Sequence, residues 1–184
     1  TVVEVATHEL ENPFYSANPV DRCYFCKDEL FTRLDARVVD ELGLDVVAYG
    51  ENADDALRPD RPGSRAAREH HVRHPLASAG ATKADVRDIA AHLGLHAAAK
   101  PASPCLSSRI PHGQEVTAEK LAAIDAAEDA VLAAGFSDCR VRHHGDSARI
   151  EVPTDEFGLL ADHARSTHLL AEVRAAGFRH VTLD

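Results

Sequence analysis

The first hundred residues combine short apolar runs with one long apolar stripe. The runs VVEVA (2–6) and DVVAYG (45–50) are typical of buried strands. Between them the pattern predicts a helix from about Arg22 to Glu41, capped by Asp21. Its stripe is formed by apolar residues at every fourth position: Leu30, Leu34, Val38 and Leu42. A capping-box pattern at Thr82 predicts a second helix. The order strand, helix, strand, helix favours an α/β layer with a parallel sheet.

The rest of the chain has the pattern of a small α+β unit. A helix is expected from Thr117 to about Ala134, followed by two strands, CRVRHH and ARIEVP, which are joined by the tight turn HGDS. A long helix over about 154–176 and a strand at 178–183 complete the series, which is ferredoxin-like in its order. We place the boundary in the proline-rich loop PASPCLSSRIPHG, so the expected domains are residues 1–104 and 105–184.

Charge and composition exclude several classes of partner. The chain has 184 residues, of which 30 are acidic and 20 basic, so its net charge is −10. A protein that binds nucleic acid in general needs a positive field, so nucleic acid is not an expected partner. No apolar run approaches the roughly 18 residues of a membrane helix. We therefore expect a cytoplasmic protein without membrane contacts.

Three cysteines carry the strongest chemical signal. Cys23 and Cys26 fall in the first turn of the predicted helix, on one face, where the helix dipole favours the thiolate. Cys105 lies in a polar loop with an arginine nearby. Three soft thiolates are one ligand short of a closed tetrahedral site, which leaves a coordination position open for chemistry. The alternative for the pair is that both thiols only pack. Cys139 has no partner motif and is expected to be structural.

Charged side chains in the second half provide another signal. Arg140 and Arg142 are two apart on a strand, so they project from one face and could clamp a phosphate or carboxylate. The alternative is a solvated strand face. Glu128 falls on the apolar stripe of its helix, where a carboxylate has an ionic partner or a chemical role. An arginine of the following strands is its expected partner. Arg149 and Glu151 are expected to pair across the sheet surface.

Two weaker signals concern ligand binding in the first half. Asn52, Asp54 and Asp55 follow a predicted strand end, which is where α/β sheets bind ligands. The twelve histidines show no metal-binding spacing with a carboxylate, so most are expected at the surface.

Over nearly its whole length the chain resembles the ATP-dependent sulfur transferases of the LarE type, within the PP-loop pyrophosphatase superfamily. The matching segments, in order, are NPVDRCYFCKDELF, GENADD with RPGSRAAREHHVRHPLASAGATKADVRDIAAHLGL, KPASPCLSSRIPHG, RVRHHGDSARIEVP and GFRHVTLD. The resemblance implies a Rossmann-like PP-loop domain, N-terminally incomplete, followed by a small α+β domain for sulfur transfer and oligomerisation. It also implies a homo-oligomer.

The resemblance further implies an enzyme that acts on a small-molecule nucleotide. With ATP and Mg²⁺ it would adenylylate a carboxylate of a pyridinium biscarboxylate mononucleotide and then replace oxygen with sulfur, in nickel-pincer nucleotide biosynthesis. Some members sacrifice their own cysteine, and others use a [4Fe-4S] cluster on three cysteines. This chain is similar to the second kind, because it has the Cys23–Cys26 pair and because Pro104 stands where the sacrificial cysteine falls. Cys23, Cys26 and Cys105 would then ligate the cluster.

The same resemblance assigns roles to residues of the second half. The implied catalytic residues are Cys105, Glu128 and Arg109, and the implied substrate or phosphate ligands are Ser108, Arg140 and Arg142. The family's SGGxDS loop, whose amides cradle pyrophosphate, is absent. We therefore expect the chain to begin downstream of that loop, and the adenylylation step to belong to the full-length parent.

Three alternatives stay open. A PP-loop relative such as a nucleoside-modifying synthetase could hold structural zinc on the three cysteines with a histidine or water. A tRNA-thiolating PP-loop enzyme also uses three cysteines and a cluster, although the net charge of −10 weighs against tRNA. An inactive module would release no pyrophosphate from ATP and substrate.

Overall fold

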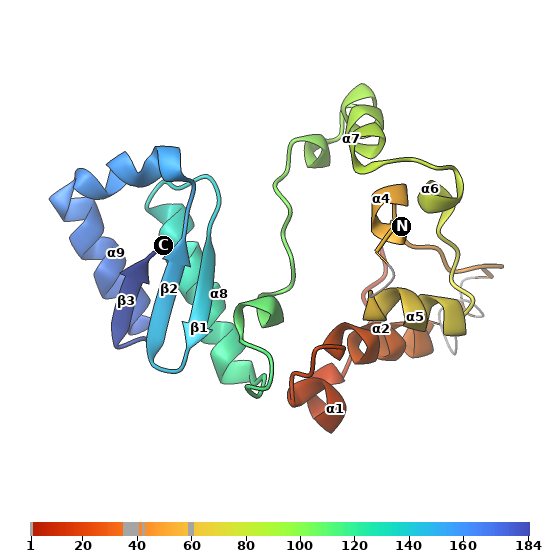
Figure 1. Ribbon diagram of the computed structural model, residues 1–184, viewed down its shortest axis with the longest axis horizontal. Coiled ribbons are helices and arrows are strands. Elements are labelled where there is room, and N and C mark those ends of the chain that lie inside the picture. Colours follow the sequence, from red (N-terminus) through yellow and green to blue (C-terminus); the bar gives the residue numbers. More distant parts are fainter. Residues whose placement is uncertain (1, 35–40, 42, 59–60) are drawn as a thin grey trace. The chain divides into compact units, whose positions relative to one another are not determined.

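The computed structural model describes residues 2–34, 41, 43–58 and 61–184 (Figure 1). Contacts between residues divide the chain into two compact units, Thr1–Ala102 and Ser103–Asp184, which we call unit 1 and unit 2. The described part of unit 1 is built of short helices, and unit 2 combines helices with a small sheet. This mixture confirms an α/β protein at the level of class. No helix in the described part of the chain is long and apolar enough to cross a membrane.

Local capping interactions start several helices of unit 1. Thr82 accepts a hydrogen bond from the Asp85 backbone N–H and Asp85 returns one, so the predicted capping box is confirmed. Asn52 forms the same box with Asp55. The described helices of unit 1 are η1 (Glu9–Glu11), α1 (Pro13–Ser16), α2 (Arg22–Arg33), α4 (Ala53–Ala56), α5 (Pro62–Glu69), α6 (Pro75–Ser78), α7 (Lys83–His92) and η3 (His96–Ala98).

The core of unit 1 forms where α2 packs against α5. Phe31 of α2 and the small pair Ala66 and Ala67 of α5 are buried together with Val72. The small alanine side chains let the two helices approach closely. α2 begins at Arg22, as the apolar pattern predicts; Val38 and Leu42 of the predicted stripe lie outside the described residues.

The two strands predicted in unit 1 are wrong for the described residues. Residues 2–6 have no regular structure, and Val2 is exposed. Segment 45–50 forms a single parallel bridge between Ala48 and Arg73. An apolar run becomes a strand only when a neighbouring strand satisfies its backbone groups in a continuous ladder. One bridge provides two such hydrogen bonds, so the described part of unit 1 contains no parallel sheet.

Unit 2 is a three-stranded sheet with helices packed against it (Figure 1). β1 and β2 pair antiparallel through the predicted tight turn, and β3 pairs parallel to β2, so α9 crosses over between them. α8 contacts β1, and α9 contacts both α8 and β3. The elements are η4 (Leu106–Arg109), α8 (Ala118–Ala133), β1 (Arg140–His144), β2 (Ser147–Glu151), η5 (Thr154–Ala161), α9 (His163–Ala175) and β3 (His180–Leu183).

The long helix predicted over 154–176 is divided at Asp162. Its backbone is extended there (φ −71°, ψ 110°), and its side chain accepts hydrogen bonds from the N–H groups of Ala164 and Arg165. This is an N-cap, and an N-cap residue is not helical. Residues 154–161 form the 3-10 helix η5 instead. The prediction was therefore wrong about one continuous helix, although both halves are helical.

Burial alternates along the strands of unit 2. Val141 and His143 of β1 and Ala148 and Ile150 of β2 are buried. They face the core, which is completed by Ile124, Ala127, Val131, Leu169, Val173 and Phe178. Because side chains alternate across a strand, the arginines of both strands project from the opposite face of the sheet.

Candidate functional site

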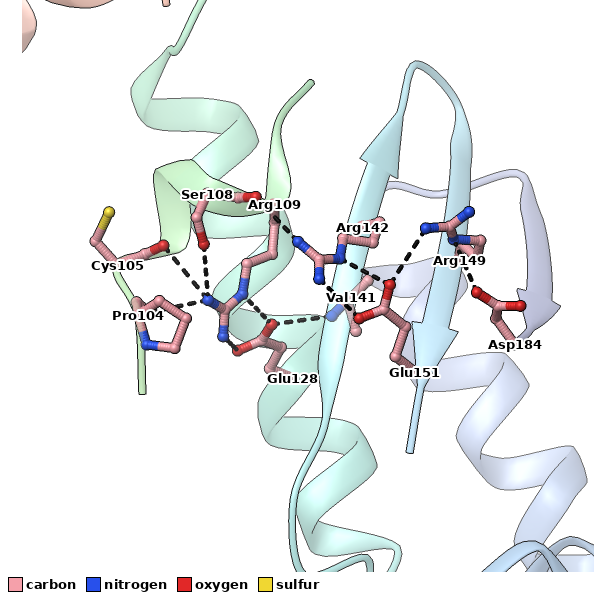
Figure 2. A network of polar contacts seen from close by, with 10 residues as sticks. All are labelled: Pro104, Cys105, Ser108, Arg109, Glu128, Val141, Arg142, Arg149, Glu151 and Asp184. Atoms are coloured by element: carbon pink, nitrogen blue, oxygen red, sulfur yellow. Dashed lines mark hydrogen bonds and ion pairs between the residues drawn. The ribbon is translucent and has the colours of Figure 1, made fainter. Parts of the chain in front are cut away.

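Arg109 braces the loop that carries Cys105 (Figure 2). Its Nη1 donates hydrogen bonds to the Pro104 carbonyl at 2.8 Å, to Ser108 Oγ at 3.0 Å and, at 3.4 Å, to the Cys105 carbonyl. Its Nε and Nη2 donate to the two carboxylate oxygens of Glu128 at 2.8 and 3.1 Å. Only 4% of the Arg109 side chain is exposed. All three nitrogens of the Arg109 guanidinium therefore donate hydrogen bonds to groups of the protein.

Glu128 joins this loop to the sheet. Besides Arg109, its Oε1 accepts a hydrogen bond from the backbone N–H of Val141 at 2.9 Å. The prediction that Glu128 pairs with an arginine of the following strands is therefore wrong. Its partner, Arg109, precedes α8, and Arg142 is paired with Glu151 instead.

Arg142 forms a second bidentate pair, with Glu151. Its Nε and Nη2 donate at 2.9 and 2.8 Å, and its Nη1 donates to the Ser108 carbonyl at 3.1 Å. The hydrogen bond from Arg142 lowers the pKa of Glu151, and the same bond raises the pKa of Arg142. Arg149 also donates to Glu151, at 3.2 Å, and pairs with Asp184 at 3.5 Å. The predicted Arg149–Glu151 pair is confirmed.

Arg140 differs from Arg142 in having an available charge. Its guanidinium makes no hydrogen bond or ion pair within the described residues, and it lines a cavity of about 230 Å³. The cavity is also lined by Asp138, Cys139, Glu151, Val152 and Pro153. Of the two arginines expected to form a clamp, Arg140 is thus the one open to an anion. Phosphate binding by this pair stays a prediction.

The four cysteines fall into two groups by accessibility. Cys23 is exposed and Cys26 half-buried in the first turns of α2, and Cys105 is exposed at the N-cap of η4. Figure 2 shows the Cys105 thiol pointing away from the Arg109 network. Cys139 is buried, and its thiol lies 3.6 Å from the Glu128 carbonyl. Burial raises the pKa of Cys139 to about 12, so this thiol is unreactive, as expected for a structural cysteine.

The predicted cluster ligands belong to both units. Cys23 and Cys26 are in unit 1, and Cys105 is in unit 2. Within residues 2–34, 41, 43–58 and 61–184, no three His, Cys, Asp or Glu side chains are grouped so that they could hold a metal ion. The three-cysteine ligand set stays a prediction.

A cavity of about 420 Å³ lies in unit 1 beside Cys23. At its wall the buried carboxylate of Glu51 accepts hydrogen bonds from the hydroxyls of Tyr49 and Ser64. Burial alone would raise the pKa of Glu51, but these hydrogen bonds outweigh it and lower that pKa. Burial raises the pKa of Tyr49 to about 12. The cavity is lined by Cys23, Lys27, Tyr49, Gly50, Glu51, Asp55, Arg61, Pro62, Gly63 and Ser64.

Of the three residues that the sequence indicated for ligand binding here, Asp55 lines this cavity, whereas Asn52 and Asp54 do not. Asn52 and Asp55 are occupied by their capping box, and Asp54 accepts a hydrogen bond from the Lys83 N–H at 2.8 Å. Glu51 and Lys27 were not singled out. A signal for Lys27 did exist, because it stands four residues after Cys23 and thus on the same helical face.

No protein-family model matches the chain. It is 43% identical over 180 residues to the uncharacterized protein slr1717 of Synechocystis, covering 98% of this chain and 66% of that protein. It is 35% identical over 175 residues to the pyridinium-3,5-bisthiocarboxylic acid mononucleotide synthase of Lactiplantibacillus plantarum, covering 91% of this chain and 59% of the synthase. It is 29% identical to the uncharacterized protein MJ0830 of Methanocaldococcus jannaschii, of which it covers 64%.

The chain thus spans about three fifths to two thirds of the length of these relatives. Over this span the chain is similar to the synthase, and its cysteine and arginine motifs resemble those of the LarE-type family.

Proposed function

We propose that the protein is a sulfur transferase of nickel-pincer nucleotide biosynthesis, which converts carboxylates of a pyridinium biscarboxylate mononucleotide to thiocarboxylates. The similarity to a synthase named for a bisthiocarboxylic acid mononucleotide supports this proposal. The structural observation that carries it is the Pro104–Arg109 loop, in which Arg109 holds the backbone while the Cys105 thiol stays exposed.

The arginines suit a substrate with a phosphate and two carboxylates. Arg140 lies beside a cavity and has no ion pair or hydrogen bond with the described residues, so it would bind the phosphate through paired N–H donors. Arg142 is held by Glu151 and by the Ser108 carbonyl, so it would fix the position of the loop relative to β1, next to Arg140. In this scheme Arg109 and Glu128 position the loop and do not touch the substrate.

Sulfur transfer to a carboxylate needs a leaving group. In the full-length parent, ATP with Mg²⁺ would convert the carboxylate to an acyl-adenylate. Sulfur would then attack the carbonyl carbon, so that a carbon–sulfur bond forms while the carbon–oxygen bond to AMP breaks and AMP leaves with its electron pair. Exchange on both carboxylates would give the bisthiocarboxylate.

The donor set fits a [4Fe-4S] cluster as the sulfur carrier. Cys23, Cys26 and Cys105 form no disulfide and are not fully buried, and soft thiolates are the ligands that such clusters require. A cluster on three thiolates would supply one iron with an open coordination position. Cys139 is excluded from this set by its burial and by its thiol pKa of about 12.

Metal analysis after anaerobic purification tests the proposal. We expect about four irons and at least four acid-labile sulfides per chain, as the cluster stoichiometry requires. Cys105→Ala should lose them, and the matched variant Cys139→Ala should keep them, because the Cys139 thiol is buried and is not one of the three proposed cluster ligands. Zinc without iron would indicate the structural zinc site instead, and the absence of metal would leave the sacrificial-cysteine mechanism.

Activity and assembly need the full-length parent. With ATP, Mg²⁺ and the biscarboxylate nucleotide, mass spectrometry should detect a mass gain of one sulfur for one oxygen per carboxylate. Absence of both pyrophosphate and thiocarboxylate would contradict the proposal. We also propose that the parent is a homo-oligomer, and a monodisperse monomer in light scattering would contradict this.

A further inference from the structure

The cavity beside Cys23 is lined by one cation, Lys27, that has no ion-pair partner among the described residues. Lys27 follows Cys23 by one helical turn, and both line the cavity. The Lys27 stem packs on α5, since a Cβ at Gly63 would lie 3.2 Å from its Cγ. The ammonium lies 5.5 Å from the Phe31 ring centroid and 5.7 Å from that of Tyr49. Among the described residues it forms no hydrogen bond or ion pair.

The other charges of the cavity are satisfied by their neighbours. Glu51 accepts hydrogen bonds from the hydroxyls of Tyr49 and Ser64. Asp55 pairs with Arg61 at 2.6 Å. Three of the four charged side chains are thus occupied, and the fourth is the ammonium of Lys27. The carboxylate oxygens of Glu51 and Asp55 are engaged by their neighbours, so Lys27 is the charged donor of this cavity that remains for a ligand, which favours an anionic one.

The size and wall of the cavity narrow the class of ligand. About 420 Å³ lies within the usual range of small-molecule sites, roughly 300–1,000 Å³, and is too large for a bare inorganic ion. The Tyr49 ring and the Lys27 stem provide apolar surface beside the charge. A small organic anion matches both properties.

We propose that this cavity binds a small carboxylate-bearing molecule, with the carboxylate on the Lys27 ammonium and the molecule held against the Cys23 thiol. The inference rests on the proposed function in one respect: it identifies this cavity as a place where a carboxylate of the substrate is held near a sulfur ligand. The binding itself requires neither ATP nor a cluster.

Two alkylating reagents test the site on the 184-residue chain, reduced and free of metal. Iodoacetate and iodoacetamide react with a thiolate by the same displacement of iodide, but only iodoacetate carries a carboxylate. The ratio of their rate constants at each cysteine, measured by peptide mass spectrometry, therefore isolates carboxylate recognition from thiolate fraction. Cys105 in unit 2 serves as an internal reference, because it is also exposed but does not line this cavity.

We expect the ratio at Cys23 to exceed that at Cys105 by about fivefold, the size of one partly exposed ion pair. Lys27→Met should abolish this excess, and Lys27→Arg should retain most of it. Lys83→Met is the matched control, since Lys83 is also in unit 1 but begins α7 and does not line the cavity. Pyridine-3,5-dicarboxylate should slow the alkylation of Cys23 by iodoacetamide in the wild type but not in Lys27→Met.

Equal ratios at Cys23 and Cys105, or a ratio at Cys23 that Lys27→Met leaves unchanged, would overturn the inference. Tyrosine fluorescence of each variant verifies that unit 1 is folded, and Lys27→Arg gives a second, conservative test if Lys27→Met is unstable. A Lys27-dependent preference for iodoacetate at Cys23, together with a full-length parent that forms no thiocarboxylate, would refute the proposed function but not the inference about the cavity. Thiocarboxylate formation without a Lys27-dependent preference for iodoacetate at Cys23 would refute the inference about the cavity and leave the proposed function standing.

Discussion

The ion pair between Arg109 and Glu128 allows a quantitative test of how unit 2 holds its loop. Glu128→Gln keeps the size of the side chain but removes its charge and turns one acceptor into a donor. If the amide oxygen keeps the bonds from Arg109 Nε and the Val141 N–H, the amide nitrogen faces Arg109 Nη2, which is also a donor. Arg109 cannot lose its proton, so a charge that is only 4% exposed is left without a counter-ion.

The expected cost follows from the burial of the pair. Removing one partner of a buried ion pair costs about 3–5 kcal/mol. Glu128 is 13% exposed, so some solvent can reach the site and the lower value of about 3 kcal/mol applies. Domains are stable by only about 5–15 kcal/mol, so unit 2 would lose a large share of its stability.

Two optical signals separate the units in a urea titration. The three tyrosines, Tyr15, Tyr24 and Tyr49, all lie in unit 1, whereas helices of both units contribute to far-UV circular dichroism. Glu128→Gln should leave the transition seen by tyrosine fluorescence unchanged. The part of the circular dichroism transition that reports unit 2 should move to a lower urea concentration. With a slope of about 1–3 kcal/mol per molar, the shift is about 1–3 M.

Glu151→Gln is the matched control, because it makes the same chemical change in a pair that is 26% exposed on both sides. It should cost about 1 kcal/mol or less. The double variant Arg109→Met with Glu128→Leu should recover only part of the loss. Replacing a whole buried pair by apolar groups is often neutral, but here the Val141 N–H and the Pro104 carbonyl also lose their partners. A loss for Glu128→Gln no larger than that for Glu151→Gln would refute the reasoning.

Three further predictions concern single side chains. His143 is buried with its Nδ1 unpaired within the described residues, and burial lowers its pKa. The unfolded state therefore binds more protons than the folded state, so unit 2 should lose stability as the pH falls below about 6.5. His143→Leu should weaken this pH dependence, as measured by urea titrations at several pH values. The pKa of Tyr49 is raised to about 12, so unit 1 should lose stability as the pH rises above about 10, where the unfolded phenol ionises. Tyr49→Phe should reduce this loss in urea titrations followed by far-UV circular dichroism. Asp162→Ala removes the N-cap of α9 and should cost about 1 kcal/mol in the unit 2 transition, whereas Asp155→Ala, a substitution in η5 where no cap bond is made, should cost less than half as much.

Features that depend on nearby residues could be predicted from the sequence. The Thr82–Asp85 capping box, the turn between β1 and β2 and the extent of α8 each follow from residues a few positions apart. The pairing of Arg149 with Glu151 also follows from spacing along one strand. The periodic pattern failed at Asp162, because an aspartate in an apolar helical stretch gives no sign of whether it points to solvent or caps the next helix.

Features that depend on distant residues could not be predicted. The partner of Glu128 is 19 residues earlier in the chain and becomes its neighbour only when η4 packs on α8. The cavity of unit 1 brings together α2, the segment around Glu51 and the first turn of α5. Apolar runs predict burial, but whether 45–50 becomes a strand depends on a partner strand, which sequence periodicity does not contain.

Because Arg109 holds the Cys105 loop, the conformational entropy of that loop is lost when the protein folds and not when a reactant binds. Ordering a backbone costs about 1–2 kcal/mol per residue. Here Arg109 already fixes the carbonyls of Pro104 and Cys105 in the folded protein, before any reactant binds. A reactant that meets Cys105 therefore finds a preorganised loop and does not have to order it on binding. Substitutions in α8 that loosen Glu128 would then weaken the encounter at the cysteine, even though they lie outside the loop.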